Sequence, residues 1–363
     1  MIKILQVVSS LKKNGTETFI MNAWHALDKK EITFDFLIFD NSKDGYYEEI
    51  VETESKVFIL PSRKDGFFKY LSNLDNFFRT VSIEYEAIHF HCTSFTTIAP
   101  LYFAKKYGIK KRIAHIHGSN CRGFHNKVLH SINKQFIPFL SNIYLSCSSK
   151  ASKWGYKTTR IFSKSEIIPN GINVEKFKFD YSKREKIREK LNLKSNAILL
   201  IHVGMLNPIK NHKFLIDIIK ELKDQEINYK LICIGEGNQR EYLENYAVSQ
   251  RVSSLVSFLG HKNNIADFLS AADIFVFPSL HEGFGISLLE AQANGLPVLC
   301  SSGIPQEVNL SSNFNILDLK EGAKVWAKKI SEIALQKNIR EESPSIQDHS
   351  IATTINALRR IYM

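Results

Sequence analysis

Residues 277–299 read FPSLHEGFGISLLEAQANGLPVL, and this stretch decides the fold. It leaves an apolar run of strand length, passes through a Gly-Phe-Gly turn and continues with apolar residues at helical spacing. Glycines in such a turn let the backbone approach a ligand closely, and the free N–H groups at the helix start suit a phosphate. The stretch therefore predicts a phosphate-binding loop at the carboxyl end of a strand in a parallel α/β sheet.

Two glutamates flank this turn. Glu282 precedes it and Glu290 follows eight residues later, which would separate them by about 12 Å if the whole interval were helical. At that distance they cannot share one proton as a catalytic pair. Each carboxylate can instead accept hydrogen bonds from hydroxyl groups of a sugar or a ribose. The alternative is two ordinary acidic side chains near a helix start, where acids are favoured in any case.

The rest of the chain alternates strand-length apolar runs with helical-period segments, which is typical of βαβ units. The composition agrees with an ordinary globular chain, since 44% of the 363 residues are hydrophobic and 23% are charged. Strands are predicted at residues 2–8, 33–39, 57–60, 87–90, 112–116 and 142–146, and again at 197–203, 229–234, 256–259, 273–277 and 297–300.

The repeated pattern predicts two doubly wound, Rossmann-like domains. We expect an N-terminal domain at residues 1–168, a C-terminal domain at 169–343 and a final helix at 344–363 that packs back on the first domain. Residues 167–177, followed by the highly charged segment 183–194, are expected to connect the domains. Because open parallel sheets bind ligands outside the carboxyl ends of their strands, two facing domains would form one interdomain cleft.

The positive charge is concentrated in the first half of the chain. Residues 1–165 hold 24 Lys and Arg against 14 Asp and Glu, whereas residues 166–363 hold 24 against 23. Residues 87–165 hold thirteen Lys and Arg and no acidic residue, with a cluster at 105–112. Such a surface attracts an anionic membrane, a diphosphate-bearing substrate or nucleic acid. Nucleic acid ranks last, because no RNP-like strand, zinc finger or helix-turn-helix pattern is present.

Several other classes are excluded by what the sequence lacks. No apolar run is long enough for a membrane span and the N-terminus lacks a secretory pattern, so we expect a cytoplasmic chain. The five cysteines are scattered without a CxxC pair, which argues against a zinc cluster. No DxD motif is present, and we expect metal-independent chemistry with no cofactor. Neither GxGxxG nor GxxxxGK[ST] occurs, which excludes dinucleotide oxidoreductases and P-loop NTPases.

The segment EGFGISLLEAQANGLPV, residues 282–298, resembles the E-x7-E signature of the retaining nucleotide-sugar glycosyltransferases of family 4. That family has the GT-B fold, which consists of two facing Rossmann-like domains. The resemblance extends over essentially the whole chain. The further motifs, in chain order, are NGTETFIMN at 14–22, RIAHIHGS at 112–119, IPNGIN at 168–173, HVGMLNPIKNH at 202–212, GEG at 235–237 and FLG at 258–260.

The resemblance implies a role for each residue that matches a family motif. Glu282 would hold hydroxyls of the donor sugar, and Glu290 would hold the nucleotide ribose. Lys210 would neutralise the leaving diphosphate, and a strand-end histidine would contact the donor sugar and support catalysis. The positions that would line the donor through their backbone are Gly15, Gly283, Phe284, Gly285 and Ile286.

Two positions leave the assignment open. His117 ends a predicted strand beside a glycine and is the favoured catalytic histidine, but His115 should lie on the same side of that strand, and His89 and His91 pose the same difficulty one strand away. Met205 stands where family members commonly carry an arginine, so one of two expected cations for the diphosphate is missing.

The resemblance and the charge pattern together predict a retaining, hexosyltransferase-type enzyme. It would move a sugar from a nucleoside diphosphate donor to a hydroxyl acceptor. The expected acceptor is a lipid-linked saccharide in polysaccharide or glycolipid assembly, and the expected location is peripheral, on the inner face of the cytoplasmic membrane. Two alternatives remain: another sugar-nucleotide enzyme such as an epimerase, and, from a different class, a basic nucleic-acid-binding protein.

Overall fold

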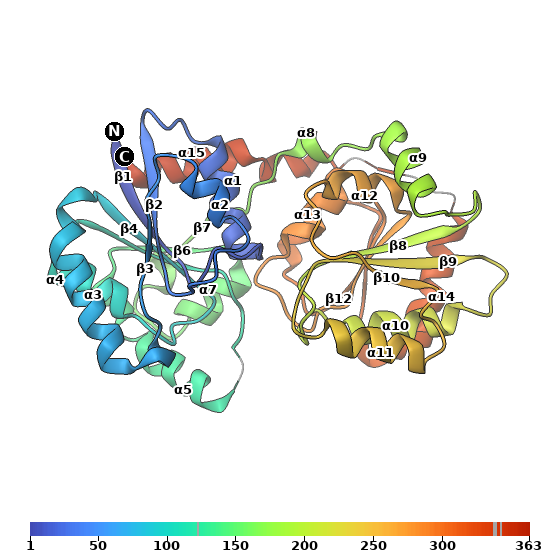
Figure 1. The fold of residues 1–363 in the computed structure, drawn as a ribbon, viewed down its shortest axis with the longest axis horizontal. Helices are drawn as coiled ribbons and strands as arrows, with labels where there is room; N and C mark the ends of the chain where they lie inside the picture. The colour runs from blue at the N-terminus through green and yellow to red at the C-terminus, as the bar shows by residue number, and fades with distance from the viewer. Residues whose placement is uncertain (122, 337–339, 342) are drawn as a thin grey trace. The chain divides into compact units, whose positions relative to one another are not determined.

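The computed structural model describes residues 1–121, 123–336, 340–341 and 343–363, and the chain divides into two compact units (Figure 1). The first unit comprises Met1–Gly171 together with Ile351–Met363, so the C-terminal segment belongs to it. The second unit comprises Ile172–Ser350. Every strand pair in both units is parallel, which gives two Rossmann-like α/β domains as the sequence predicts.

The first unit contains a seven-stranded sheet in the order β3-β2-β1-β4-β5-β6-β7. Helices α1 and α15 contact each other and lie over one face, whereas α3 and α4 pack together over the other. The strands are β1 (Ile2–Val7), β2 (Ile32–Ile38), β3 (Val57–Ile59), β4 (Ala87–Cys92), β5 (Lys111–Ile116), β6 (Ile143–Ser146) and β7 (Glu166–Ile167). The helices are α1 (Gly15–Ala26), α2 (Tyr47–Val51), α3 (Phe67–Val81), α4 (Ala99–Lys106), α5 (Phe124–Asn133), α6 (Ile137–Leu140), α7 (Ser149–Tyr156) and α15 (Ile351–Tyr362).

The second unit contains a six-stranded sheet in the order β10-β9-β8-β11-β12-β13. Helices α10, α11 and α14 build its main apolar core against the sheet, and α12 and α13 cover the opposite face (Figure 1). The strands are β8 (Ile198–Val203), β9 (Tyr229–Ile234), β10 (Val256–Phe258), β11 (Ile274–Phe277), β12 (Val298–Ser301) and β13 (Phe314–Leu317). The helices are α8 (Val174–Phe177), α9 (Tyr181–Lys190), α10 (His212–Leu222), α11 (Arg240–Ser249), α12 (Ile265–Ala271), α13 (Ile286–Ala293) and α14 (Gly322–Leu335).

The strand order reverses once in each sheet. In the first unit the reversal lies between β1 and β4, and in the second it lies between β8 and β11. At such a point the loops that follow the two strands run in opposite directions, which leaves a space for a ligand at the carboxyl ends. These two positions are therefore where the topology favours binding sites.

The eleven strands predicted from the sequence are confirmed to within one or two residues at most ends. Two strands were missed, β7 and β13, each at one edge of its sheet. The charged segment 183–194 is not a connection. It lies largely within α9, a helix of the second unit that packs on α12. None of the helices in the described part of the chain is long and apolar enough to cross a membrane.

A buried ionic cluster attaches α9 to the sheet of the second unit. Asp273, only 3% exposed, immediately precedes β11 and lies 2.6 Å from Nη2 of Arg184 and 3.1 Å from Nη1 of Arg188. The same carboxylate accepts a 2.7 Å hydrogen bond from the backbone N–H of Leu199. Removing one member of such a cluster leaves the others buried without compensation.

We expect Asp273→Asn to lower the free energy of unfolding of the second unit by about 3 kcal/mol, because two guanidinium groups lose their only carboxylate partner in this cluster. Urea denaturation measures the change. The matched control is Asp267→Asn, which removes a more exposed carboxylate 3.4 Å from Lys183 and should cost less than about 1 kcal/mol. Equal losses in the two variants would contradict a special role for the buried cluster.

Candidate active site

The loops that follow β8 and β11 meet at the strand-order reversal of the second unit. The backbone N–H of Leu280 donates to the carbonyl of Ile209 at 2.8 Å, which joins the two loops directly. Across this junction Nζ of Lys210 lies 2.7 Å from Oε1 of Glu282. The two side chains are only 18% and 13% exposed. The structure thus brings together two of the three catalytic residues predicted from the sequence.

Lys210 is held in place along its whole length. The Asn207 side chain accepts hydrogen bonds from the backbone N–H groups of Ile209 and Lys210, which shapes the loop. The lysine stem passes beside Gly204, where an added Cβ would lie 3.2 Å from Cε, and its ammonium lies 4.7 Å from the Phe277 ring centre. A larger residue at position 204 would push this stem away.

The glycine turn at residues 283–285 leads directly into α13. Gly285 is the residue before the helix and has φ of 99°, a conformation that favours glycine. Phe284 is buried and its ring lies 5.5 Å from that of His349, which anchors the turn. The first two N–H groups of α13, those of Ile286 and Ser287, precede the bond in which Leu288 donates to the Gly285 carbonyl at 2.9 Å, and they suit an anion.

Glu290 lies one turn into α13, whereas Glu282 belongs to the preceding loop. The estimate of 12 Å from helical rise therefore does not apply, since α13 begins only at Ile286. Burial raises the pKa of Glu290 to about 7, and Lys176 opposes the rise. Among the described residues the Glu290 carboxylate has no hydrogen-bond partner, so its oxygens can accept bonds from a ligand. Met205 lies in the loop after β8 and is partly exposed.

In the first unit, the loop that follows β1 carries Gly15, the first residue of α1. Asn14 is the residue before the helix, and its side chain does not cap the helix backbone. Glu17 is instead 4% exposed and accepts a hydrogen bond from the Ser10 hydroxyl at 3.1 Å. Burial raises the pKa of Glu17 to about 7. The loop is thus tied to its helix by a buried carboxyl group.

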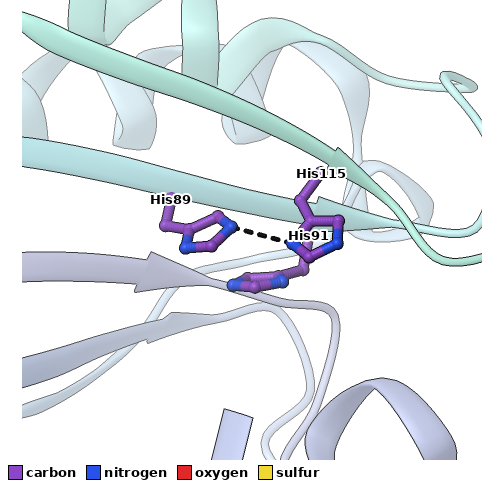
Figure 2. Close-up of side chains that lie close together, drawn as sticks. All are labelled: His89, His91 and His115. Atoms are coloured by element: carbon purple, nitrogen blue, oxygen red, sulfur yellow. Dashed lines mark hydrogen bonds between the residues drawn. The ribbon is translucent and has the colours of Figure 1, made fainter. Parts of the chain in front are cut away.

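His117 directly follows β5 and is 8% exposed, and His115 lies on the same side of the strand as predicted. Both belong to a buried group of four histidines with His89 and His91 of β4. Nε2 of His89 lies 3.0 Å from Nδ1 of His115, as Figure 2 shows, and Nδ1 of His91 lies 2.9 Å from Nε2 of His117. Burial lowers the pKa of all four, that of His117 to about 3. At neutral pH the four rings are uncharged.

The geometry of this group also bears on metal binding. His89, His91 and His115 each offer a ring nitrogen, and these three atoms lie within 4.8 Å of one another (Figure 2). Nitrogen is a suitable ligand for zinc. However, the His89 and His115 nitrogens already share a hydrogen bond, and no carboxylate belongs to the group. The arrangement fits a hydrogen-bonded network of neutral rings better than a cation site.

The structure also adds residues that the sequence did not single out. Gln6 of β1 and Tyr362 of α15 both hydrogen-bond to the histidine group, although Tyr362 lies 356 residues after Gln6. No sequence pattern links these two positions. The local signal of a polar sheet face is the alternation of His89 with His91 and of His115 with His117.

Comparisons with known proteins agree with this architecture. The family model described as "Glycosyltransferase Family 4" matches residues 13–176, and the one described as "Glycosyl transferases group 1" matches residues 183–343.

Two relatives and one solved structure match along most of the chain. The capsular polysaccharide biosynthesis glycosyltransferase CapH of Staphylococcus aureus is 26% identical over 100% of this chain and 99% of its own length. The UDP-Gal:alpha-D-GlcNAc-diphosphoundecaprenol alpha-1,3-galactosyltransferase of Escherichia coli is 24% identical over 83% of this chain and 79% of its own. The crystal structure of Anabaena HepE in complex with UDP and glucose superposes with a TM-score of 0.81 at 18% identity, covering 99% of both chains.

The two family models together span both Rossmann-like units, and the structural match extends over the same length. This chain belongs to glycosyltransferase family 4, with the GT-B fold.

Proposed function

We propose that this enzyme transfers a hexose from a nucleoside diphosphate sugar to a hydroxyl group of a saccharide or lipid-linked saccharide, with retention at the anomeric carbon. The observation that carries the proposal is the Lys210–Glu282 pair at the strand-order reversal of the second unit, beside the start of α13. The named acceptor of the Escherichia coli relative, a diphosphoundecaprenol-linked sugar, and the capsular polysaccharide role of CapH support this class of acceptor.

The pair suits the charges that sugar transfer creates. As the glycosidic bond breaks, positive charge grows on the sugar ring and negative charge grows on the leaving diphosphate. A lysine ammonium has three N–H donors, so Lys210 can bind a phosphate oxygen while it keeps or exchanges its contact with Glu282. The Glu282 carboxylate can accept hydrogen bonds from sugar hydroxyls. This cation and the N–H groups of α13 would stabilise the leaving group without a metal ion.

Because position 205 is a methionine and not an arginine, the charge of the leaving diphosphate depends more on Lys210 for its stabilisation. A methionine side chain gives a phosphate no hydrogen bond and no charge. Lys210 would then be the main side-chain cation of the second unit for the leaving diphosphate. Its loss should affect kcat more than donor binding, since the transition state carries extra negative charge on the diphosphate that the bound donor does not carry.

We expect Lys210→Met to lower kcat at least about 100-fold while the donor KM changes only a few-fold. Glu282→Gln should raise the donor KM and lower kcat together, because it weakens bonds to the sugar. A screen of nucleotide sugars with saccharide acceptors, read by product analysis with and without acceptor, measures both and separates transfer from epimerisation. Lys213→Met removes a nearby exposed lysine of α10 and serves as the control. A Lys210→Met variant with wild-type kcat would contradict the proposal.

We also propose that Glu290 binds the ribose hydroxyls, and its raised pKa gives this role a pH dependence. Hydroxyl donors favour the ionised carboxylate, so binding would release a proton from Glu290 when the pH is below about 7. Affinity should therefore fall as the pH drops through 7 and stay level above it.

The measurement is the Kd of a nucleotide sugar between pH 5.5 and 8.5 by calorimetry, because its diphosphate bridge does not titrate in this range. We expect about a tenfold weaker Kd at pH 6 than at pH 8. The Glu290→Gln variant should bind more weakly than wild type at pH 8 and show a flat profile. A flat profile in the wild type, together with a Glu290→Gln variant that binds as tightly as the wild type, would contradict this role.

The first unit offers a surface suited to an anionic membrane. Exposed apolar side chains recur every four residues along α5 and just beyond it, and their exposed fractions are 84% at Phe124, 38% at Val128, 53% at Ile132 and 52% at Phe136. They lie within the acid-free stretch of residues 87–165. An apolar helix face among basic residues is the pattern of proteins that lie on acidic lipid surfaces. We propose that this face attaches the enzyme to the inner leaflet of the cytoplasmic membrane.

Vesicle sedimentation tests the attachment. Wild-type protein should bind vesicles rich in phosphatidylglycerol more strongly than neutral phosphatidylcholine vesicles, and added salt should weaken the binding. The double variant Phe124→Ser, Ile132→Ser should bind about tenfold more weakly, since two apolar side chains leave the lipid. The control is Tyr242→Ser, Val248→Ser on α11, where the native side chains are 50% and 62% exposed. Equal binding to both vesicle types would count against the proposed surface.

A further inference from the structure

We propose that Gln6 and Tyr362 determine which ring nitrogen of His117 carries the proton, acting through His91. In the resulting state, Nε2 of His117 is protonated and Nδ1 presents a lone pair. Gln6 and Tyr362 are then positioning residues for the predicted catalytic histidine. The proton assignment stands on the first unit alone, and its consequence for catalysis rests on the function proposed above.

Because the histidine rings are neutral, each must have one N–H donor and one nitrogen lone pair. Fixing the role of one nitrogen in such a ring therefore fixes the role of the other. A series of neutral rings joined by hydrogen bonds has one direction throughout, set wherever a group of known polarity joins it.

The Gln6 amide supplies that polarity. Its carbonyl oxygen lies 2.7 Å from Nε2 of His91, and a carbonyl can only accept, so Nε2 of His91 is the donor. Nδ1 of His91 is then a lone pair, and it lies 2.9 Å from Nε2 of His117. The proton in this second hydrogen bond must come from His117. Nδ1 of His117 is left as an acceptor.

Tyr362 holds the amide in this orientation. The amide nitrogen of Gln6 donates to the Tyr362 hydroxyl at 3.3 Å. The single hydroxyl proton of Tyr362 is then directed to Nδ1 of His89 at 2.6 Å, and Nε2 of His89 donates to Nδ1 of His115 at 3.0 Å. Five hydrogen bonds thus run head to tail from His117 to His115. If the amide were rotated so that its carbonyl faced Tyr362, every bond would reverse and Nδ1 of His117 would become a donor.

His115 lies at the far end of this series. Its Nε2 is buried and has no hydrogen-bond partner in the described residues. In the direction derived above this atom is an N–H, and in the reverse direction it is a lone pair. The Phe19 ring of α1 packs beside the His115 ring, with the ring centres 5.2 Å apart and the planes at 83°.

The state of His117 matters because of its position. It directly follows β5, at the carboxyl edge of the sheet where ligands bind, and it keeps 8% exposure whereas His89 and His115 have none. An acceptor nitrogen there would bind a substrate hydroxyl group through its proton. If Nδ1 of the same ring were protonated, it would be a donor, and the sugar oxygen would have to accept the hydrogen bond through a lone pair.

The test is the protonation state of His117, read by long-range ¹H–¹⁵N NMR on protein labelled at histidine. In the wild type we expect the His117 proton on Nε2. In Tyr362→Phe, which frees the Gln6 amide to rotate, and in Gln6→Met, which removes it at similar volume, we expect a mixture of both protonation states. The transferase kcat should fall about tenfold in these variants, with little change in the donor KM.

Tyr156→Phe is the matched control. Tyr156 is equally buried in the first unit and donates its hydroxyl to the carbonyls of Ala114 and Leu145 at 2.7 and 3.1 Å, apart from the histidines. This variant loses buried hydrogen bonds of the same kind, so it should be destabilised while the His117 signals and kcat stay close to wild type. If Tyr362 had only a structural role, Tyr362→Phe and Tyr156→Phe would have the same effects on stability, on the His117 signals and on kcat.

Three results would overturn the proposal. The first is a proton on Nδ1 of His117 in the wild type, and the second is a set of His117 signals that is unchanged in both Tyr362→Phe and Gln6→Met. The third is bound zinc that displaces the ring N–H protons of His89 and His115, with these protons returning when a chelator removes the zinc. Failure of the proposed function is a separate result. It would appear as wild-type protein that binds no nucleotide sugar, and the NMR spectra would still decide the protonation state.

Discussion

The ion pair between Lys210 and Glu282 depends on one topological constraint, the reversal of strand order between β8 and β11. These strands are neighbours although 70 residues separate their ends, so the loops after them meet at the same edge of the sheet. An ion pair that is largely shielded from water adds little net stability, because the cost of desolvating the two charges offsets their attraction. The importance of this one is therefore positional: it places a cation and a carboxylate next to the free N–H groups at the start of α13. Gly204 is required because the lysine stem passes close to it and needs the space. Gly285 is required because the start of α13 needs a positive φ at this position.

Local sequence patterns predicted the elements and the loops of this site, because strand runs and glycine turns are properties of neighbouring residues. The Lys210–Glu282 contact itself required the order of the strands, which the sequence implied only through its resemblance to a family. The histidine network lay further beyond prediction. His89, His91, His115 and His117 were visible as alternating residues on two strands, but Gln6 and Tyr362 join them from opposite ends of the chain. Only the folded sheet and α15 bring these groups into contact.

Two edge strands and one charged helix are elements that local sequence patterns did not predict. β7 has two residues and β13 has four, and both are formed because an existing sheet edge offers unpaired backbone groups. The high charge of the segment at 183–194 predicts a connection between the domains. Two of its arginines instead contact Asp273, so buried ionic contacts help to attach its helix to the second unit.

The two units therefore present different electrostatic environments at the carboxyl ends of their strands. The second unit holds a full positive and a full negative charge close together, as suits a reaction in which charge separates. The first unit holds four uncharged imidazoles, because burial lowers the pKa of each ring. Neutral donors and acceptors select hydroxyl groups by direction rather than by charge, and direction is what the hydrogen bonds from Gln6 through His91 would impose on His117. If the proposed reaction holds, stabilisation of charge is a property of the second unit, and orientation of hydroxyl groups is a property of the first.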